Sequence, residues 1–147
     1  MFPVKSSRLV AGIAVTLVVG GCSDPPPAPP PPGTLSAGTA EITINGASVD
    51  TTHDVDCTSE GALTTIHTGN DDAGTTAAVD MSEGMTVQFA QIRNLGGFTG
   101  SYRAELDPVA EVQQAGRTLL MNGTANGFNA SNPSARISQT FSIRVAC

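Results

Sequence analysis

From about residue 40 to the end of the chain, short stretches alternate between hydrophobic and polar residues. The last stretch is the clearest, and the residues of one parity are Ile137, Gln139, Phe141, Ile143, Val145 and Cys147. Polar residues and Arg144 fill the other parity. A period of two gives a strand one buried face and one solvated face, so this pattern predicts a half-buried final β-strand.

Earlier stretches show the same alternation, separated by turn signals. Asn45-Gly46 follows the alternating run 40–44 and is a strong tight-turn dipeptide. The other strand candidates are 47–50, 54–58, 62–68, 75–81, 85–94, 98–106 and 117–122, the last with an extension through a bend over 123–128. Val109 to Ala115 is the one candidate helix, and a loop is the alternative because the segment lacks a full amphipathic pattern.

The number and spacing of these stretches indicate the fold class. Short strands rich in Thr, Gly and Asn, with turn residues between them, are typical of all-β domains. We expect residues 40 to 147 to form a small antiparallel β-sandwich or flattened barrel of about 7–9 strands. The expected domain has one disulfide and at most one short helix.

The first 21 residues have a different pattern. Lys5 and Arg8 precede an apolar run of 11 residues, Leu9 to Val19, and small residues follow it. A basic segment, a short apolar segment and a small-residue cleavage site are the parts of a secretory signal peptide. The run spans only about half of a ~30 Å hydrocarbon core at 1.5 Å per residue, so we expect a cleaved signal rather than a spanning helix.

The sequence Val19-Gly20-Gly21-Cys22 resembles the lipobox of bacterial lipoprotein precursors. The resemblance implies that the signal peptidase recognises Val19, Gly20 and Gly21 and cleaves before Cys22, whose thiol carries diacylglycerol. The alternative is an ordinary signal peptide with an incidental cysteine. Because two or three acyl chains anchor a protein stably, we expect a lipid-anchored protein on the extracytoplasmic face of the cell membrane.

Residues 22 to 39 form the predicted tether between the lipid and the domain. Pro25–Pro27 and Pro29–Pro32 favour polyproline II, which extends ~3.1 Å per residue and acts as a semi-rigid spacer. The predicted division is therefore a signal peptide over 1–21, a lipidated tether over 22–39 and a β-domain over 40–147.

The net charge argues against one class of partner, and the cysteine content predicts a disulfide. Without residues 1–21 the chain has five arginines, no lysine and 13 acidic residues, a formal charge of −8, which argues against nucleic-acid binding. Cys57 and Cys147 remain once Cys22 is lipidated, and in an oxidising compartment they predict a structural disulfide. Free thiols or a redox pair are the alternative, which the lack of a C-x-x-C arrangement disfavours.

Groups that could perform catalysis are few. His53 and His67 have no acidic residues at metal-ligand spacing, so surface histidines are favoured over a zinc site or a general base. The acidic stretches 54–56 and 70–74 lack the closing glutamate of a calcium loop. We therefore predict no catalytic residues, no metal and no cofactor. Five apolar residues could line either an ordinary hydrophobic core or a groove for an acyl chain, and we favour the core. They are Val87, Phe89, Ile92, Leu119 and Met121.

Three segments of the predicted domain resemble the mycobacterial 19-kilodalton lipoprotein antigen family. They are Asp56-Cys57-Thr58, the pair 123–127 and 130–133, and the closing run Phe141 to Cys147. The resemblance implies a surface-exposed envelope lipoprotein that host innate receptors recognise through its acylated amino terminus, and it supplies no catalytic residues. The tether differs, because it is Pro-rich where the family's is Thr/Ser-rich and can be O-glycosylated.

These observations lead to one expected function and one alternative. The expectation is a non-enzymatic cell-envelope lipoprotein, attached to the membrane by acyl chains on Cys22, that displays its β-domain as a surface antigen or host-interaction protein. The alternative is a membrane-tethered carrier of a lipid or small apolar ligand.

Overall fold

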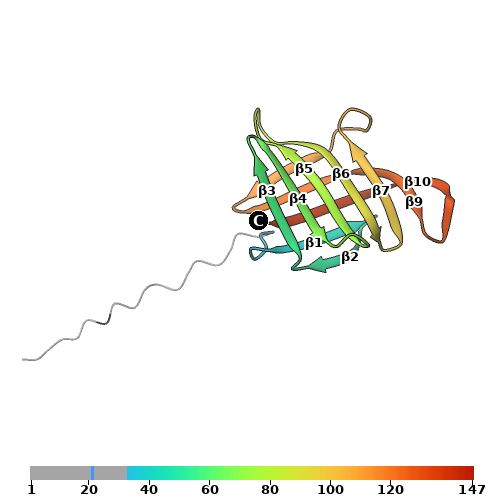
Figure 1. The fold of residues 1–147 in the computed structure, drawn as a ribbon, viewed down its shortest axis with the longest axis horizontal. Coiled ribbons are helices and arrows are strands. Elements are labelled where there is room, and N and C mark those ends of the chain that lie inside the picture. The colour runs from blue at the N-terminus through green and yellow to red at the C-terminus, as the bar shows by residue number, and fades with distance from the viewer. Residues whose placement is uncertain (1–20, 22–32) are drawn as a thin grey trace, which may run out of the picture.

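The computed structural model describes Gly21 and residues 33–147, so Cys22 and most of the predicted signal peptide and tether lie outside the described residues. The described chain folds into ten antiparallel strands (Figure 1). They are β1 (Thr39–Ile44), β2 (Ala47–Thr52), β3 (Val55–Glu60), β4 (Leu63–Gly69), β5 (Gly74–Asp80), β6 (Thr86–Leu95), β7 (Phe98–Arg103), β8 (Glu111–Ala115), β9 (Thr118–Asn129) and β10 (Asn132–Ala146).

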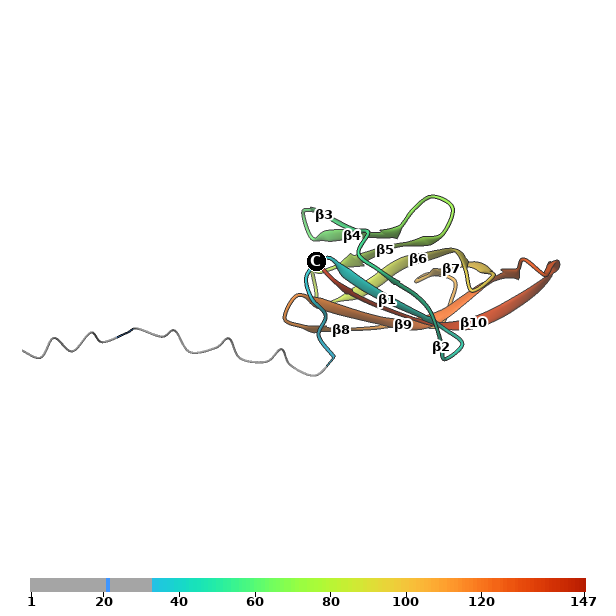
Figure 2. The same cartoon turned by 90° about the horizontal axis from the view of Figure 1, so that it is seen from below.

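All ten strands belong to one sheet, in the order β2-β1-β10-β9-β7-β6-β5-β4-β3, with β8 pairing the first half of β9. The sheet curls into a nearly closed, flattened barrel. Figure 2 shows β3–β7 as one layer and β1, β2 and β8–β10 as the other. The prediction of an all-β antiparallel sandwich or flattened barrel is confirmed, with ten strands where seven to nine were expected.

The candidate helix Val109 to Ala115 was wrong, because residues Glu111–Ala115 form β8. This strand pairs only with β9, and its residues are mostly exposed, so its sequence carries little of the alternation that a half-buried strand needs. Among the described residues no helix has the length and apolar character needed to cross a membrane.

The core lies between the two layers and follows the predicted parity of the last strand. Phe141, Ile143 and Val145 are buried in it, while Ser142 and Arg144 are partly exposed on the opposite side. The first hairpin also forms as predicted. Asn45 and Gly46 have φ values of 51° and 81°, the left-handed conformation that a two-residue type I′ turn requires.

A disulfide joins the two layers of the curled sheet. Cys57 lies on β3, the last strand of the sheet order, and Cys147 follows β10 in the other layer, with their Cα atoms 5.9 Å apart. Close by, the hydroxyl of Thr39 and Nδ1 of His53 are 3.2 Å apart, which ties β1 to the β2–β3 connection. The predicted disulfide is thus present and closes the barrel where strand pairing does not.

Candidate functional site

One continuous row of polar side chains runs across the outer face of the sheet, from β3 through β7 to β9 and β10. Strand register places one residue from each of seven strands opposite the next, and these residues are exposed or half-buried. The row is Asp56, His67, Thr76, Gln91, Ser101, Asn126 and Ser138. Because every member is polar, this row is a surface able to form hydrogen bonds with a ligand.

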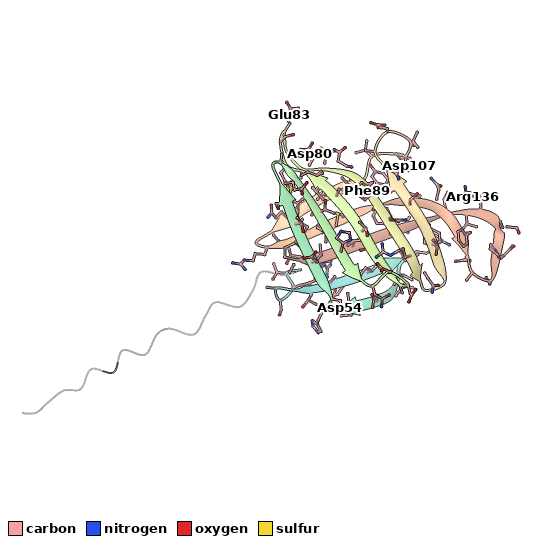
Figure 3. All side chains as sticks on the ribbon, viewed as in Figure 1. Asp54, Asp80, Glu83, Phe89, Asp107 and Arg136 are labelled. Carbon is pink, nitrogen blue, oxygen red and sulfur yellow. A yellow bond between two sulfur atoms is a disulfide. The ribbon has the colours of Figure 1, made fainter. Side chains whose placement is uncertain are left out.

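A β-bulge in β6 places an aromatic ring beside this row. Ala78 pairs with Phe89 and the next residue of β5 pairs with Val87, so Gln88 is an extra residue. A bulge of one residue reverses the alternation, which leaves both Val87 and Ala90 in the core and turns Phe89 to the outer face (Figure 3). The guanidinium carbon of Arg103 lies 5.9 Å from the centre of the Phe89 ring, a cation–π contact.

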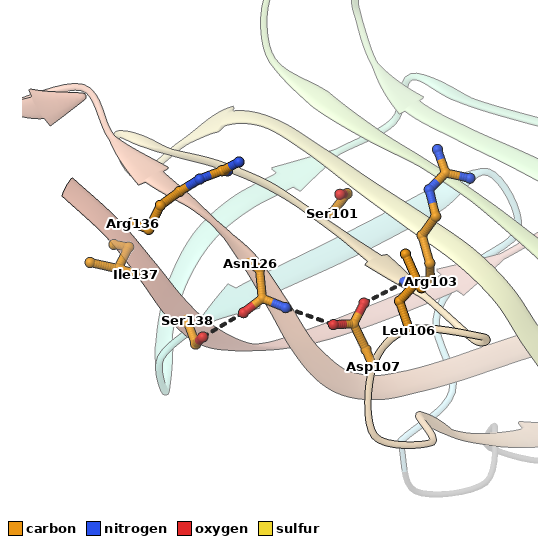
Figure 4. Close-up of a pocket in the computed structure, with 8 residues that line it drawn as sticks. All are labelled: Ser101, Arg103, Leu106, Asp107, Asn126, Arg136, Ile137 and Ser138. Atoms are coloured by element: carbon orange, nitrogen blue, oxygen red, sulfur yellow. Dashed lines mark hydrogen bonds between the residues drawn. The ribbon is translucent and has the colours of Figure 1, made fainter. Parts of the chain in front are cut away.

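Arg103 lines three adjoining hollows in this face, of about 470, 430 and 280 Å³. We call them together the Arg103 groove. The largest hollow lies between the end of β7 and the β9–β10 hairpin (Figure 4). Its lining residues are Ser101, Arg103, Leu106, Asp107, Asn126, Arg136, Ile137 and Ser138.

A chain of hydrogen bonds fixes the polar groups of the largest hollow (Figure 4). The hydroxyl of Ser138 donates to Oδ1 of Asn126 over 2.5 Å, and Nδ2 of Asn126 donates to Oδ1 of Asp107 over 2.6 Å. The other carboxylate oxygen of Asp107 accepts from the backbone N–H of Arg103 over 2.7 Å. Three strands and the loop after β7 are thereby linked, and the groove is preorganised.

The loop after β7 is held against the core although part of it is fully exposed. The buried hydroxyl of Tyr102 accepts a hydrogen bond from the backbone N–H of Ala110 over 3.0 Å. Between these anchors, Leu106 and Val109 are each 81% exposed. Asp107-Pro108 ends the strand candidate 98–106, and the loop that contains this dipeptide forms one wall of the groove.

The residues considered as metal or catalytic groups do not come together. Nδ1 of His67 lies 3.1 Å from the hydroxyl of Thr76, whereas His53 pairs with Thr39 near the disulfide. In residues 33–147 no group of three or more His, Cys, Asp or Glu side chains is placed to hold a metal ion. Both histidines are exposed and each lies within hydrogen-bonding distance of a threonine.

The acidic stretch 70–74, which resembles a calcium-loop fragment, and Asp80 in the next turn have local structural roles. Oδ1 of Asn70 accepts hydrogen bonds from the backbone N–H groups of Asp72 and Ala73, which closes the β4–β5 turn. The backbone oxygen of Asn70 accepts from the guanidinium of Arg93. In the β5–β6 turn, hydrogen bonds from the hydroxyl and backbone N–H of Ser82 lower the pKa of Asp80.

Four of the five residues weighed as core or acyl groove are core. Val87, Ile92, Leu119 and Met121 are buried in the cluster between the layers. For Phe89 the core prediction was wrong, because the bulge at Gln88 turns it outward. The groove could not be predicted from the sequence for the same reason. The alternation along β7 places Arg103 on the outer face, but the ring of Phe89 that it contacts faces outward only because of a bulge that has no clear sequence signal.

Comparison with known proteins identifies the family. Residues 33–147 match the model of the Mycobacterium 19 kDa lipoprotein antigen family. The chain belongs to this family. "Putative lipoprotein" sequences from Mycobacterium avium subsp. hominissuis and Mycobacterium indicus pranii are 34% and 36% identical over 110 residues, covering 74% of this chain and 76% and 78% of theirs. "Probable lipoprotein LppE" of Mycobacterium tuberculosis is 31% identical, over 74% of this chain and 77% of its own length.

Membership confirms the resemblance on which the sequence interpretation relied. The 19 kDa lipoprotein antigen family is a family of mycobacterial lipoproteins, so the chain is a lipoprotein of the mycobacterial type, and lipid anchoring in the cell envelope follows. The acylation of Cys22, the recognition of Val19, Gly20 and Gly21, and the domain boundaries at residues 21 and 39 stay predictions.

Proposed function

We propose that this family member is a non-enzymatic envelope lipoprotein, anchored on the extracytoplasmic face through acyl chains on Cys22, that displays its β-domain to partners outside the membrane. The order of segments supports it most directly. The lipobox-like sequence ends at Cys22, and the family match begins at residue 33, so a short Pro-rich segment alone separates the anchor from the domain.

The way the chain enters the domain agrees with display. The backbone N–H of Leu35 donates to the hydroxyl of Thr118, and that of Gly38 donates to the carbonyl of Ala146. The entering chain is thus fixed at the carboxyl end of β10. Arg136 is ten residues from Ala146 along the same strand, about 33 Å at ~3.3 Å per residue, so the Arg136 end of the Arg103 groove lies far from the attachment point.

The proposal includes a role as a surface antigen or host-interaction protein, and this arrangement is compatible with that role. In the proposal the acylated amino terminus is the feature that host innate receptors recognise, and the domain is the part exposed to other proteins. No nucleic acid is expected as a partner, because the acidic residues outnumber the arginines.

The alternative, carriage of an acyl chain between the layers, receives less support. The residues that would line such a groove are Val87, Ile92, Leu119 and Met121, and they are packed in the core cluster with at most 4% exposure. A carried acyl chain would have to displace these contacts. The structure of the described domain therefore favours display over carriage.

Replacing Cys22 tests the anchoring. We expect a full-length chain produced in a mycobacterial host to incorporate an alkyne-labelled palmitate, and Cys22→Ala to lose the label completely, because the thiol is the proposed site of diacylglycerol attachment. Ser36→Ala, a change outside the lipobox, is the matched control and should keep the label. Labelled Cys22→Ala protein would overturn the proposal.

A further inference from the structure

The middle of the polar row lines the two larger hollows of the Arg103 groove. Both hollows are lined by Ser101 and Arg103, so they adjoin at β7. Gln91 lines one of them, and Asn126 and Ser138 line the other (Figure 4). We call Gln91, Ser101, Asn126 and Ser138 the central row. Register places them opposite one another on β6, β7, β9 and β10, a line of about 14 Å at ~4.8 Å per strand.

The central row keeps hydrogen-bonding capacity for a ligand. The side chains of Gln91 and Ser101 form no hydrogen bond with any other residue in 33–147. Asn126 uses one N–H toward Asp107, and Ser138 uses its hydroxyl hydrogen toward Asn126. Because an amide has two N–H groups and a hydroxyl oxygen has two lone pairs, both side chains can still bond outward. The row therefore offers donors and acceptors side by side.

The charges that line the groove cancel. Arg103 and Arg136 are two cations, and Glu105 and Asp107 are two anions. The four residues of the central row are uncharged. A binding surface is complementary to its ligand in charge, so this groove suits a neutral ligand better than an anion or a cation.

Apolar side chains lie along the same hollows. The half-buried Phe89 lines the hollow that Gln91 lines, and the exposed Leu106 and the half-buried Ile137 line the larger one. Ligand sites commonly combine apolar walls with a few placed polar groups. A ligand that matches both features carries C–H surface and hydrogen-bonding groups along its whole length.

The place of the row within the sheet narrows the ligand class further. The strands β6, β7 and β9 each have a paired strand on both sides, so their backbone groups are used within the sheet. A peptide that binds as an added strand needs a free edge. The ligand must therefore bind through side chains. Sugar hydroxyls both donate and accept hydrogen bonds, and the C–H groups of a sugar ring can pack on an aromatic ring.

We propose that the central row binds a neutral oligosaccharide that lies across β6, β7, β9 and β10. The four side chains of the row bond to its hydroxyl groups, and Phe89 and Leu106 contact its C–H groups. The length of the row suits a short oligosaccharide better than a single sugar. This ligand goes beyond the proposed display function, and its binding does not depend on acylation of Cys22.

Isothermal titration calorimetry on the mature, acylated chain tests the site. The detergent is a polyoxyethylene ether, which has no sugar headgroup to compete. The neutral probes are maltotriose, cellotriose and mannotriose, with glucose and mannose as single sugars and trigalacturonate as an acidic trisaccharide. We expect saturable binding of at least one neutral trisaccharide and at least tenfold weaker binding of its single sugar. Since the ligand is uncharged, its affinity should not change with salt concentration.

Variants of exposed residues locate the binding. Gln91→Ala and Ser101→Ala should each weaken the trisaccharide by about fivefold, because each removes hydrogen bonds to its hydroxyl groups. Gln113→Ala is the matched control, since it makes the same change at an exposed position of β8 in the other layer. It should bind as the unaltered protein does. The thermal midpoint checks that each variant is folded.

Four results would overturn the proposal. They are the absence of saturable binding by all three neutral trisaccharides, tighter binding of trigalacturonate than of any neutral probe, equal weakening by Gln113→Ala, and undiminished binding by a folded Gln91→Ala variant. None of these results bears on the anchoring, which the palmitate label reports separately.

Discussion

Removing the Cys57–Cys147 disulfide should lower the free energy of unfolding by about 4 kcal/mol. The bond joins residues 90 apart in sequence, and in the chain-entropy model a loop of this length restricts the unfolded chain strongly. In the folded state it also holds β3, an outer strand paired only with β4, against the end of β10. Urea denaturation of the double variant Cys57→Ser, Cys147→Ser measures the loss.

Reduction of the unaltered protein provides the matched control. Under a thiol reductant it should become as unstable as the double variant, and the variant itself should not respond to the reductant. A decrease below about 1 kcal/mol would show that strand pairing alone closes the barrel.

The second large effect is expected at Gly127, where β9 lies between β10 and β7 and pairs with both. A Cβ atom at this position would lie 1.9 Å from the carbonyl oxygen of Thr99 and 2.5 Å from the Cα of Gly100, both backbone atoms. Since only four residue pairs join β7 to β9, the strands cannot separate there without losing much of their pairing. Gly127→Ala should therefore destabilise the domain by about 3 kcal/mol.

A second glycine separates steric overlap from backbone strain. A Cβ atom on Gly84 would meet no other atom within 4 Å, but the φ of this residue is 89°, so Gly84→Ala should cost only about 1 kcal/mol. Urea midpoints compare the two variants. If Gly127→Ala is no more destabilising than Gly84→Ala, the close approach of β7 and β9 is not as described.

The fold was largely predictable because its strongest signals are local. The parity of β10 follows from residues 137–147 alone, and the Asn45-Gly46 turn depends on two residues. β8 was missed because a peripheral strand with mostly exposed residues has no reason to alternate. The long course of β9 was only partly recognised, since Gly123 and Gly127 suggested a bend where they permit close packing.

The groove was not predictable, because it depends on pairing between distant strands. Ser101, Asn126 and Ser138 become neighbours only through the registers of β7, β9 and β10. The outward turn of Phe89 needs the bulge at Gln88. Each residue looks ordinary in sequence, and the largest hollow forms only where the loop after β7 meets the β9–β10 hairpin.

The predicted lipoprotein layout and the observed domain fit one physical scheme. A Pro-rich tether would hold the domain off the membrane, and a disulfide would keep the barrel closed in an oxidising compartment. The entering chain is fixed at one end of β10, and the Arg103 groove lies toward the other. The scheme requires that the mature chain begins at an acylated Cys22.

Intact mass spectrometry of the protein purified from mycobacterial membranes tests that requirement most directly. The predicted result is a chain that begins at Cys22, carries a diacylglycerol group with or without a further acyl chain, and lacks the two hydrogen atoms of a Cys57–Cys147 disulfide. An unacylated Cys22, or an amino terminus at any other residue, would contradict the account of this protein as a tethered lipoprotein.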